Sequence, residues 1–337
     1  LFSKTLRTFT AFKEESSKML NELDAARVDL GVYSHYVHGW MPARHHQVWL
    51  QAIQRLLTGQ STKKRLLIVA PPGAAKTHYV SIMTPLWFLG NHPDKTIIFF
   101  TNTEDRAKQA QNGVILTWEN KEHLHHRVFP LAQPDMKRGW SEDGYYLKGL
   151  PPLSATASYQ SLGYNTEILG GRGDGIIMDD PMPPKIVGSK IERIRAIERY
   201  RSVILSRLQP QGWVIVITNV LHQDDFVSFI KAQKEFWDII EMPALGYWDG
   251  DLVNGESYWP ERWSREALLA LKQEIGGPIF ETMYQGNPVV FDEAEGPYKN
   301  EWFQDYTEMD MLKKMGPEEK APTFLDSLVK FQYWDVA

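Results

Sequence analysis

The sequence contains no cysteine among its 337 residues. This absence excludes disulfide bonds and thiolate metal sites, and it fits a reducing compartment. No apolar run approaches the roughly 18 residues that a membrane-spanning helix requires. The chain also does not begin with methionine, and we expect it to be a piece of a longer protein.

The balance of charge is slightly acidic, because 42 Asp and Glu residues oppose 37 Lys and Arg residues and give a net charge of −5. This charge argues against a uniformly basic surface that coats nucleic acid, so any contact with nucleic acid must come from a local patch. Hydrophobic residues make up 43% and charged residues 23% of the chain, which is typical of a soluble α/β protein. The length allows a substantial core and about two domains.

Short β-rich runs alternate with helical patterns from residue 66 onward. Continuous apolar runs bounded by turns suit strands that are buried on both faces, and their alternation with helices indicates a parallel sheet. The predicted strands are 66–70, 96–101, 175–180, 213–218 and 237–242. The predicted helices are 78–89, 103–118, 190–208, 224–234 and 264–274, with one or two amphipathic helices within 4–28. The sequence therefore predicts an α/β fold with a mostly parallel sheet flanked by helices.

The segment 65–77 reads RLLIVAPPGAAKT, an apolar run followed by a loop of small residues and a Lys-Thr pair that opens a helical pattern. This layout is typical of a phosphate-binding loop, in which small residues let backbone N–H groups approach phosphate oxygens. The Lys76 ammonium would bind the β- and γ-phosphates, and the Thr77 hydroxyl would bind Mg²⁺. Taken alone, the segment is also compatible with a plain strand, turn and helix without any phosphate site.

The glycines of this loop depart from the usual motif. Ala70 and Ala75 stand at the two glycine positions, and only Gly73 remains. An alanine that is forced to positive φ costs about 1–2 kcal/mol. The loop alone is therefore a weaker indication of nucleotide binding than a loop with both glycines.

A second element places two carboxylates at the end of the strand 175–180, which reads GIIMDD. Asp179 stands where a Walker B carboxylate holds Mg²⁺ directly or through water, and Asp180 can polarise an attacking water. The strand 96–101 falls between the loop and this element in the sequence. That order is typical of the additional-strand, catalytic-carboxylate (ASCE, recA-like) class of P-loop ATPases. The alternative for the carboxylates alone is a strand-ending turn before Pro181.

Thr218 and Asn219 follow the next predicted strand, 213–218. Ligands gather at the carboxyl ends of the strands in a parallel sheet, so a polar residue here lies beside the expected γ-phosphate position. We expect Thr218 or Asn219 to sense hydrolysis.

With these motifs in order, the sequence resembles the large subunit of the phage terminases, the ATPases that pump DNA into procapsids. The resemblance covers nearly the whole chain. The segments that carry it are His46-Gln47 with Trp49-Leu50, the loop PPGAAKT, Gly170-Gly171-Arg172-Gly173 before Met178-Asp179-Asp180-Pro181, Ser206-Arg207-Leu208, 218–225, Tyr284-Gln285-Gly286-Asn287-Pro288, Trp302-Phe303 and 333–337.

The resemblance implies roles for the matching residues. Asp180 would be the catalytic carboxylate, where many relatives have the longer Glu, and Asn219 would join the catalytic set with Lys76. His46 and Gln47 would read the adenine, and a helix-surface pair is the alternative for them. The remaining residues of the implied site are Pro72, Gly73, Ala74, Ala75, Lys76, Thr77 and Thr218 for the nucleotide, and Thr77 and Asp179 for Mg²⁺.

An arginine from a neighbouring subunit often faces the transition-state charge in ring motors. The arginine that the family carries inside the loop is absent here, because Pro72 and Gly73 occupy that neighbourhood. Arg172 and Arg207 are the two candidates for an arginine that acts in trans, and we favour Arg172. A solvated turn arginine is the alternative for Arg172.

A basic cluster lies around the predicted helix 190–208. Such a cluster can face the DNA backbone through salt-sensitive phosphate contacts, and it can equally be a solvated helix face with ion pairs. Its members are Lys185, Lys190, Arg193, Arg195, Arg199 and Arg201.

The resemblance also implies a domain organisation: an N-terminal helical segment with the adenine-side element at 1–60, a P-loop ATPase core at 61–245, a lid or linker subdomain at 246–330, and the first strand of a ribonuclease-H-like nuclease at 331–337. Asp335 would be the first metal-binding carboxylate of that nuclease in the full-length protein. One carboxylate cannot hold two metal ions, so this chain alone should not cleave DNA.

The implied cofactors are ATP and Mg²⁺. The implied partners are double-stranded DNA, the portal of the procapsid, the small terminase subunit and further copies of the chain in a homo-oligomeric ring, expected to be pentameric. No membrane partner is expected. The protein would act in the host cytoplasm, transiently at the portal vertex, and would be absent from the mature virion.

Two other functions stay open. The first is another P-loop DNA translocase or a helicase, although a helicase would need a second recA-like domain. The second is a nucleotide-gated DNA-binding clamp with little turnover, which the substituted loop glycines favour.

Overall fold

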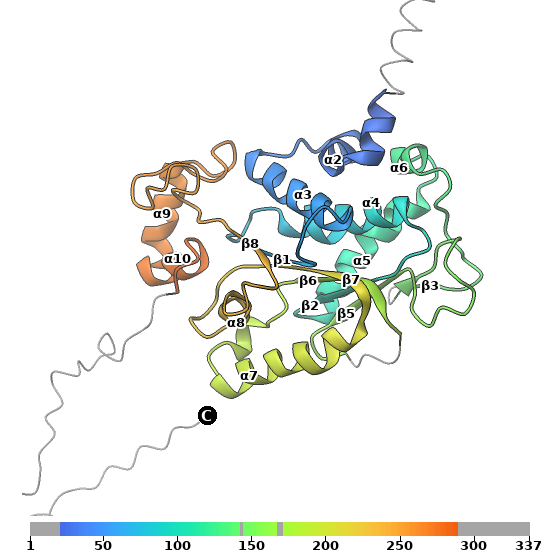
Figure 1. The fold of residues 1–337 in the computed structure, drawn as a ribbon. Helices are drawn as coiled ribbons and strands as arrows, with labels where there is room; N and C mark the ends of the chain where they lie inside the picture. Colours follow the sequence, from blue (N-terminus) through green and yellow to red (C-terminus); the bar gives the residue numbers. More distant parts are fainter. Residues whose placement is uncertain (1–20, 142–143, 167–170, 289–337) are drawn as a thin grey trace, which may run out of the picture. The chain divides into compact units, whose positions relative to one another are not determined.

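The computed structural model describes residues 21–141, 144–166 and 171–288 (Figure 1). The chain divides into two units, Leu1–Val289 and Val290–Ala337, and the described residues all belong to the first. Their centre is a sheet with the strand order β3-β4-β5-β2-β6-β7-β1-β8. The strands are β1 (Arg65–Val69), β2 (Ile97–Thr101), β3 (Trp140–Ser141), β4 (Gly144–Tyr145), β5 (Tyr159–Gly163), β6 (Gly173–Asp179), β7 (Leu208–Thr218) and β8 (Asp238–Glu241).

All neighbouring strands from β5 to β8 pair in parallel, whereas β3 and β4 form an antiparallel extension at one edge. Strand β7 lies between β1 and β6. The strand that separates the loop-bearing strand from the strand with the two carboxylates is therefore β7, which follows both motifs in the sequence, and not β2 at 97–101. The fold class predicted from the sequence is confirmed.

Helices cover both faces of the sheet (Figure 1). One face carries α2 (Leu30–His38), α3 (Arg44–Leu57), α4 (Thr84–Asn91), α5 (Glu104–Glu119) and α6 (Leu124–Val128). The other face carries α7 (Lys190–Arg199) and α8 (Phe226–Lys231). After the last strand the chain continues into α9 (Arg265–Ile275) and α10 (Gly277–Met283). Alternate strand residues supply the two cores, because successive side chains point to opposite faces. In β1, for example, Leu66 and Ile68 belong to one core and Leu67 and Val69 to the other.

All five predicted strands are confirmed, and most predicted helices are found with shifted ends. The predicted helix 78–89 begins as a π-helix, Thr77–Met83, before α4. The proline at position 85 has no N–H to donate, and the backbone N–H of Thr84 reaches back five residues to the carbonyl of Tyr79. The predicted helix 190–208 is interrupted in the same way, by a π-helix at Tyr200–Ile204 and a 3-10 turn at Leu205–Arg207.

Residues 21–28 are helical, which agrees with the end of the amphipathic pattern predicted for 4–28; the rest of that prediction lies outside the described residues. Within the described part of the chain, no helix combines the length and the apolar character that a bilayer span requires.

Candidate functional site

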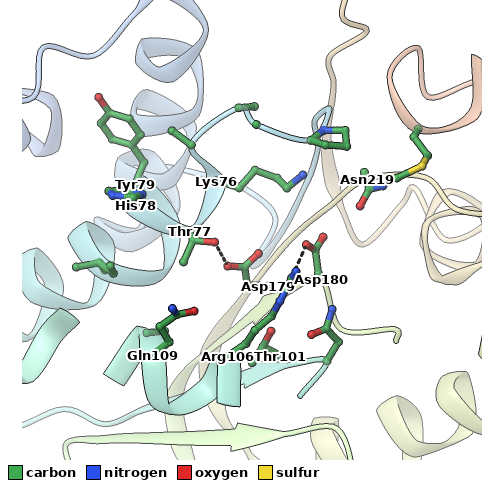
Figure 2. Close-up of a pocket in the computed structure, with 18 of the residues that line it drawn as sticks. Lys76, Thr77, His78, Tyr79, Thr101, Arg106, Gln109, Asp179, Asp180 and Asn219 are labelled. Carbon is green, nitrogen blue, oxygen red and sulfur yellow. Dashed lines mark hydrogen bonds and ion pairs between the residues drawn. The ribbon is translucent and has the colours of Figure 1, made fainter. Parts of the chain in front are cut away.

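The predicted site elements meet at one edge of the sheet, where β1, β2, β6 and β7 end. Asp179 pairs in register with Thr101 on one side and with Ile217 on the other, and Val69 pairs with Thr218. The loops that follow these strands therefore lie side by side. A cleft of about 1060 Å³ opens there, and most of the predicted nucleotide-binding residues line it (Figure 2).

Two residues of the loop after β1 have a left-handed backbone conformation. Gly73 has a φ of 77° and Ala75 a φ of 58°, so the alanine at the second glycine position lies in the left-handed region. A β-carbon added to Gly73 would lie 3.2 Å from the Trp263 ring. The loop thus carries one strained alanine and is packed from one side by an indole.

Lys76 is buried at the end of this loop. Its Nζ donates hydrogen bonds to the carbonyl oxygens of Ala70 and Pro71, at 3.0 and 3.2 Å. Burial lowers the pKa of Lys76, while the charges of Asp180 and Asp179 oppose that shift. Its ammonium group therefore faces two carboxylates across the cleft and holds the loop closed on itself.

Asp179, at the end of β6, is buried and held by two hydroxyl groups. Its Oδ2 accepts hydrogen bonds from the hydroxyl groups of Thr77 and Ser81, at 2.8 and 2.7 Å. These residues lie four positions apart on the π-helix after the loop and so share a face. Burial, followed by the charge of Asp180, raises the pKa of Asp179 to about 6, and the two hydroxyl groups and Lys76 oppose the rise. The hydroxyl and the carboxylate predicted to hold Mg²⁺ are in direct contact.

Asp180 follows in the left-handed conformation, with a φ of 47°, a region that Asp tolerates better than most residues. Its backbone N–H donates to the carbonyl of Ile217 at 2.9 Å, and its Oδ2 lies 3.4 Å from Nη1 of Arg106. Its Oδ1 is buried without a hydrogen-bond partner among the described residues. This turn directs the shorter Asp side chain into the cleft.

Of Thr218 and Asn219, the two polar residues at the end of β7, one lines the cleft. Asn219 lines it. The Thr218 hydroxyl donates instead to the carbonyl of Asn219 at 3.1 Å, and the Thr218 carbonyl accepts the N–H of Ala70 at 2.9 Å. Thr218 therefore contacts the loop through its backbone, and its predicted role at the phosphate stays a prediction.

His46 supports the loop from the side of α3. Its Nδ1 accepts the backbone N–H of Ala43, and its Nε2 lies 3.1 Å from the carbonyl of Ala74. These contacts select the neutral tautomer with the proton on Nε2, and burial lowers the pKa of His46 to about 4. Gln47 is exposed and donates to the carbonyl of Pro42. Neither side chain lines the cleft formed by the described residues, and adenine reading by them stays a prediction.

The two arginines predicted to act in trans lie away from this cleft. Arg172 immediately precedes β6 and Arg207 immediately precedes β7, which places both at the opposite edge of the sheet. Arg172 is exposed, and its carbonyl accepts the hydroxyl groups of Thr96 and Thr156. Neither arginine lines the cleft of the described residues, so any role in hydrolysis must be at another copy's site.

Three further residues that the sequence did not predict also line the cleft. Arg106, in the first turn of α5, and Arg262, with Trp259, from the segment after β8, line it. The position of Arg106 was detectable, because it lies in the first turn of the helix that follows a predicted strand whose carboxyl end faces the site. Arg262 and Trp259 lie far from every motif in the sequence, and only the fold brings them to the loop.

The basic cluster on α7 is partly committed within the fold. Arg193 is buried, donates to the carbonyl of Val187 at 2.6 Å and lies 3.5 Å from Asp224. Arg199 donates to the carbonyl of Thr166 at 2.6 Å. These contacts leave fewer charges for a partner than the sequence suggests.

The predictions for Gly170, Trp302-Phe303 and Asp335 lie outside the described residues.

No family model matches the chain, and no curated protein matches its sequence. Solved structures of phage large terminases, the family that the sequence resembles, do match. The ATPase domain of the Thermus phage P74-26 large terminase is 16% identical, with a TM-score of 0.43, over 74% of this chain and 99% of that chain. The HK97 bacteriophage large terminase is 13% identical, with a TM-score of 0.48, over 71% of this chain and 50% of that chain. A large terminase from a thermophilic bacteriophage, in complex with ADP, is 12% identical, with a TM-score of 0.41, over 72% of this chain and 56% of that chain.

Proposed function

We propose that the chain is an ATP-hydrolysing motor domain of the large-terminase type, which moves double-stranded viral DNA into a procapsid. One observation carries the ATPase part of this proposal. The Thr77 hydroxyl lies 2.8 Å from the Asp179 carboxylate, across the ends of two parallel strands, at the foot of a loop with left-handed residues and a buried lysine.

The residues fit a Mg²⁺-bound nucleotide. Thr77 and Asp179 offer the hard oxygen ligands that Mg²⁺ prefers. The Oδ1 of Asp180, which is buried and has no hydrogen-bond partner in the described part of the chain, is placed to accept a proton from a water molecule. When bound, Mg²⁺ would neutralise charge between the β- and γ-phosphates. The chain's own groups do the rest: the loop orients the phosphates, Lys76 faces them, and Asp180 orients the water.

The coupling to DNA rests on the resemblance of the sequence blocks and on the basic residues that stay exposed on α7. In this proposal the partners are duplex DNA, the portal of the procapsid, the small terminase subunit and further copies of the chain in a ring. The domain acts in the host cytoplasm, and its parent protein continues into a nuclease.

Steady-state ATP hydrolysis with and without duplex DNA tests the proposal. We expect Mg²⁺-dependent turnover that DNA stimulates, and complete loss of turnover in Lys76→Ala. Lys121→Ala, on an exposed lysine after α5, is the matched control and should retain full activity. Hydrolysis by Lys76→Ala at the rate of the control would remove the site assignment.

A nucleotide-gated DNA clamp is the second candidate. The strained Ala75 and the closed position of Lys76 favour it, because both add a cost to the binding-competent loop. Mg²⁺-dependent ATP binding that tightens DNA binding without multiple turnovers would establish the clamp in place of the motor.

A further inference from the structure

The loop at the candidate site contains no arginine, but Arg106 from another element lines the same cleft. It lies in the first turn of α5, which begins where β2 ends, and its N–H is capped by the Thr103 hydroxyl at 3.3 Å. Because β2 pairs with β6, this turn stands next to the two carboxylates. In the view of Figure 2, the carboxylates lie between Lys76 and the tip of Arg106.

The contact between Arg106 and Asp180 is of a kind that is easily exchanged. The two groups approach to 3.4 Å, and the Arg106 side chain is 59% exposed. Ion pairs that are open to water contribute little to stability. The other oxygen of Asp180 has no hydrogen-bond partner among the described residues, so the pair leaves the carboxylate only half satisfied.

The other cations of the cleft are held in different ways. Lys76 is bound to two carbonyl groups of its own loop, and the Arg262 guanidinium lies over the Trp259 ring, 5.1 Å from its centroid. Of these three, Arg106 alone is paired with Asp180, the carboxylate proposed above to orient the attacking water. Its planar fork of donors suits two oxygens of one phosphate group.

On the basis of the proposed ATPase function, we propose that Arg106 is a catalytic residue that acts within its own chain. It exchanges Asp180 for the γ-phosphate when ATP enters, and it stabilises the negative charge of the transferring phosphoryl group. The same exchange frees Asp180 to act on water. In the protein without ATP, the ion pair with Arg106 holds the Asp180 carboxylate and keeps it from acting on water.

Atoms and charge balance in the reaction, because ATP⁴⁻ and H₂O give ADP³⁻, HPO₄²⁻ and one proton. The water oxygen bonds to the γ-phosphorus, and the bond from that phosphorus to the β–γ bridging oxygen breaks. ADP leaves with the bridging electron pair. One water proton passes to the Asp180 carboxylate and on to solvent, and the other stays on the phosphate.

The test compares Arg106→Ala with Arg127→Ala, a control on an exposed arginine of α6. We expect kcat for ATP hydrolysis to fall by about 100-fold in Arg106→Ala, the effect of removing one donor from a developing charge. Its affinity for a fluorescent N-methylanthraniloyl ADP should stay unchanged, because ADP lacks the phosphate that Arg106 contacts. A merely structural defect would weaken ADP binding as well. Arg127→Ala should match the unmodified protein in both measurements.

Mixing experiments separate action within the chain from action on a neighbour. A mixture of Arg106→Ala and Lys76→Ala should show no activity beyond the sum of the two separate proteins. Restored activity in the mixture, or an unchanged kcat in Arg106→Ala, would overturn the assignment. If the unmodified protein itself neither binds nor hydrolyses ATP, the proposed function fails first, which is a distinguishable result.

Discussion

Substitution of Ala75 by glycine tests the strain in the loop directly. Ala75 has a φ of 58°, which costs a residue with a β-carbon about 1–2 kcal/mol. Glycine removes that cost, but it also makes the unfolded chain more flexible and so takes back about 0.4–1 kcal/mol. We therefore expect Ala75→Gly to raise the free energy of unfolding by about 0.5 kcal/mol.

The neighbouring residue supplies a matched control. Ala74 is 1% exposed, and it is not among the described residues with positive φ. Glycine at Ala74 removes a buried methyl group, worth about 0.8 kcal/mol, and adds a backbone entropy cost of about 0.5–1 kcal/mol. Ala74→Gly should thus lower the free energy of unfolding by about 1.5 kcal/mol, and the two variants should differ by about 2 kcal/mol.

Urea unfolding followed by tryptophan fluorescence measures this difference, since the chain has 12 tryptophans. Equal destabilisation by both substitutions would refute the left-handed conformation of Ala75. It would also refute the inference that the loop holds its phosphate-binding shape without a nucleotide.

The other predictions concern the acidic groups and the trans arginine. The pKa of Asp179 is raised to about 6 in the fold, chiefly by burial, from about 4 in the unfolded chain. The free energy of unfolding therefore falls as the pH rises from about 4 to about 6 and Asp179 ionises in the fold. Above pH 6, and without nucleotide, we expect Asp179→Asn to unfold at a higher urea concentration than the unmodified protein. Because Mg²⁺ needs the ionised carboxylate, calorimetry should show Mg²⁺-ATP binding weakening by about tenfold per unit as the pH falls below 6; a flat profile would contradict this. Asp180→Asn should bind ATP normally and hydrolyse it at least about 100-fold more slowly, and a parallel loss of binding would indicate a structural role. Arg172→Ala should regain ATPase activity when mixed with Lys76→Ala, and no regain would remove Arg172 as the trans arginine.

The strands were predictable because their sequence signal is local. Runs such as 66–70 and 213–218 are apolar at successive positions, as strands buried on both faces must be. Strand β5, Tyr159–Gly163, escaped prediction although it is largely buried, because Gln160 and Ser161 interrupt its apolar pattern. Helix ends were misplaced where π-helical turns intervene, since these depend on single backbone hydrogen bonds.

The site was predictable wherever one strand and its following loop carry the whole signal. The positions of Lys76, Asp179 and Asp180 follow from two short motifs, and so does the left-handed conformation of Ala75. The approach of Arg262 depends on packing between distant segments. A single sequence does not specify such contacts.

The indole of Trp263 makes the loop part of a mechanical linkage. Its ring lies against Gly73, and the next residue, Ser264, caps the start of α9. A shift of Gly73 toward the indole would therefore press on the ring of a residue that directly precedes the cap of α9. In the function proposed above, a change of phosphate occupancy would reach the chain beyond residue 263 through this contact between Gly73 and the indole.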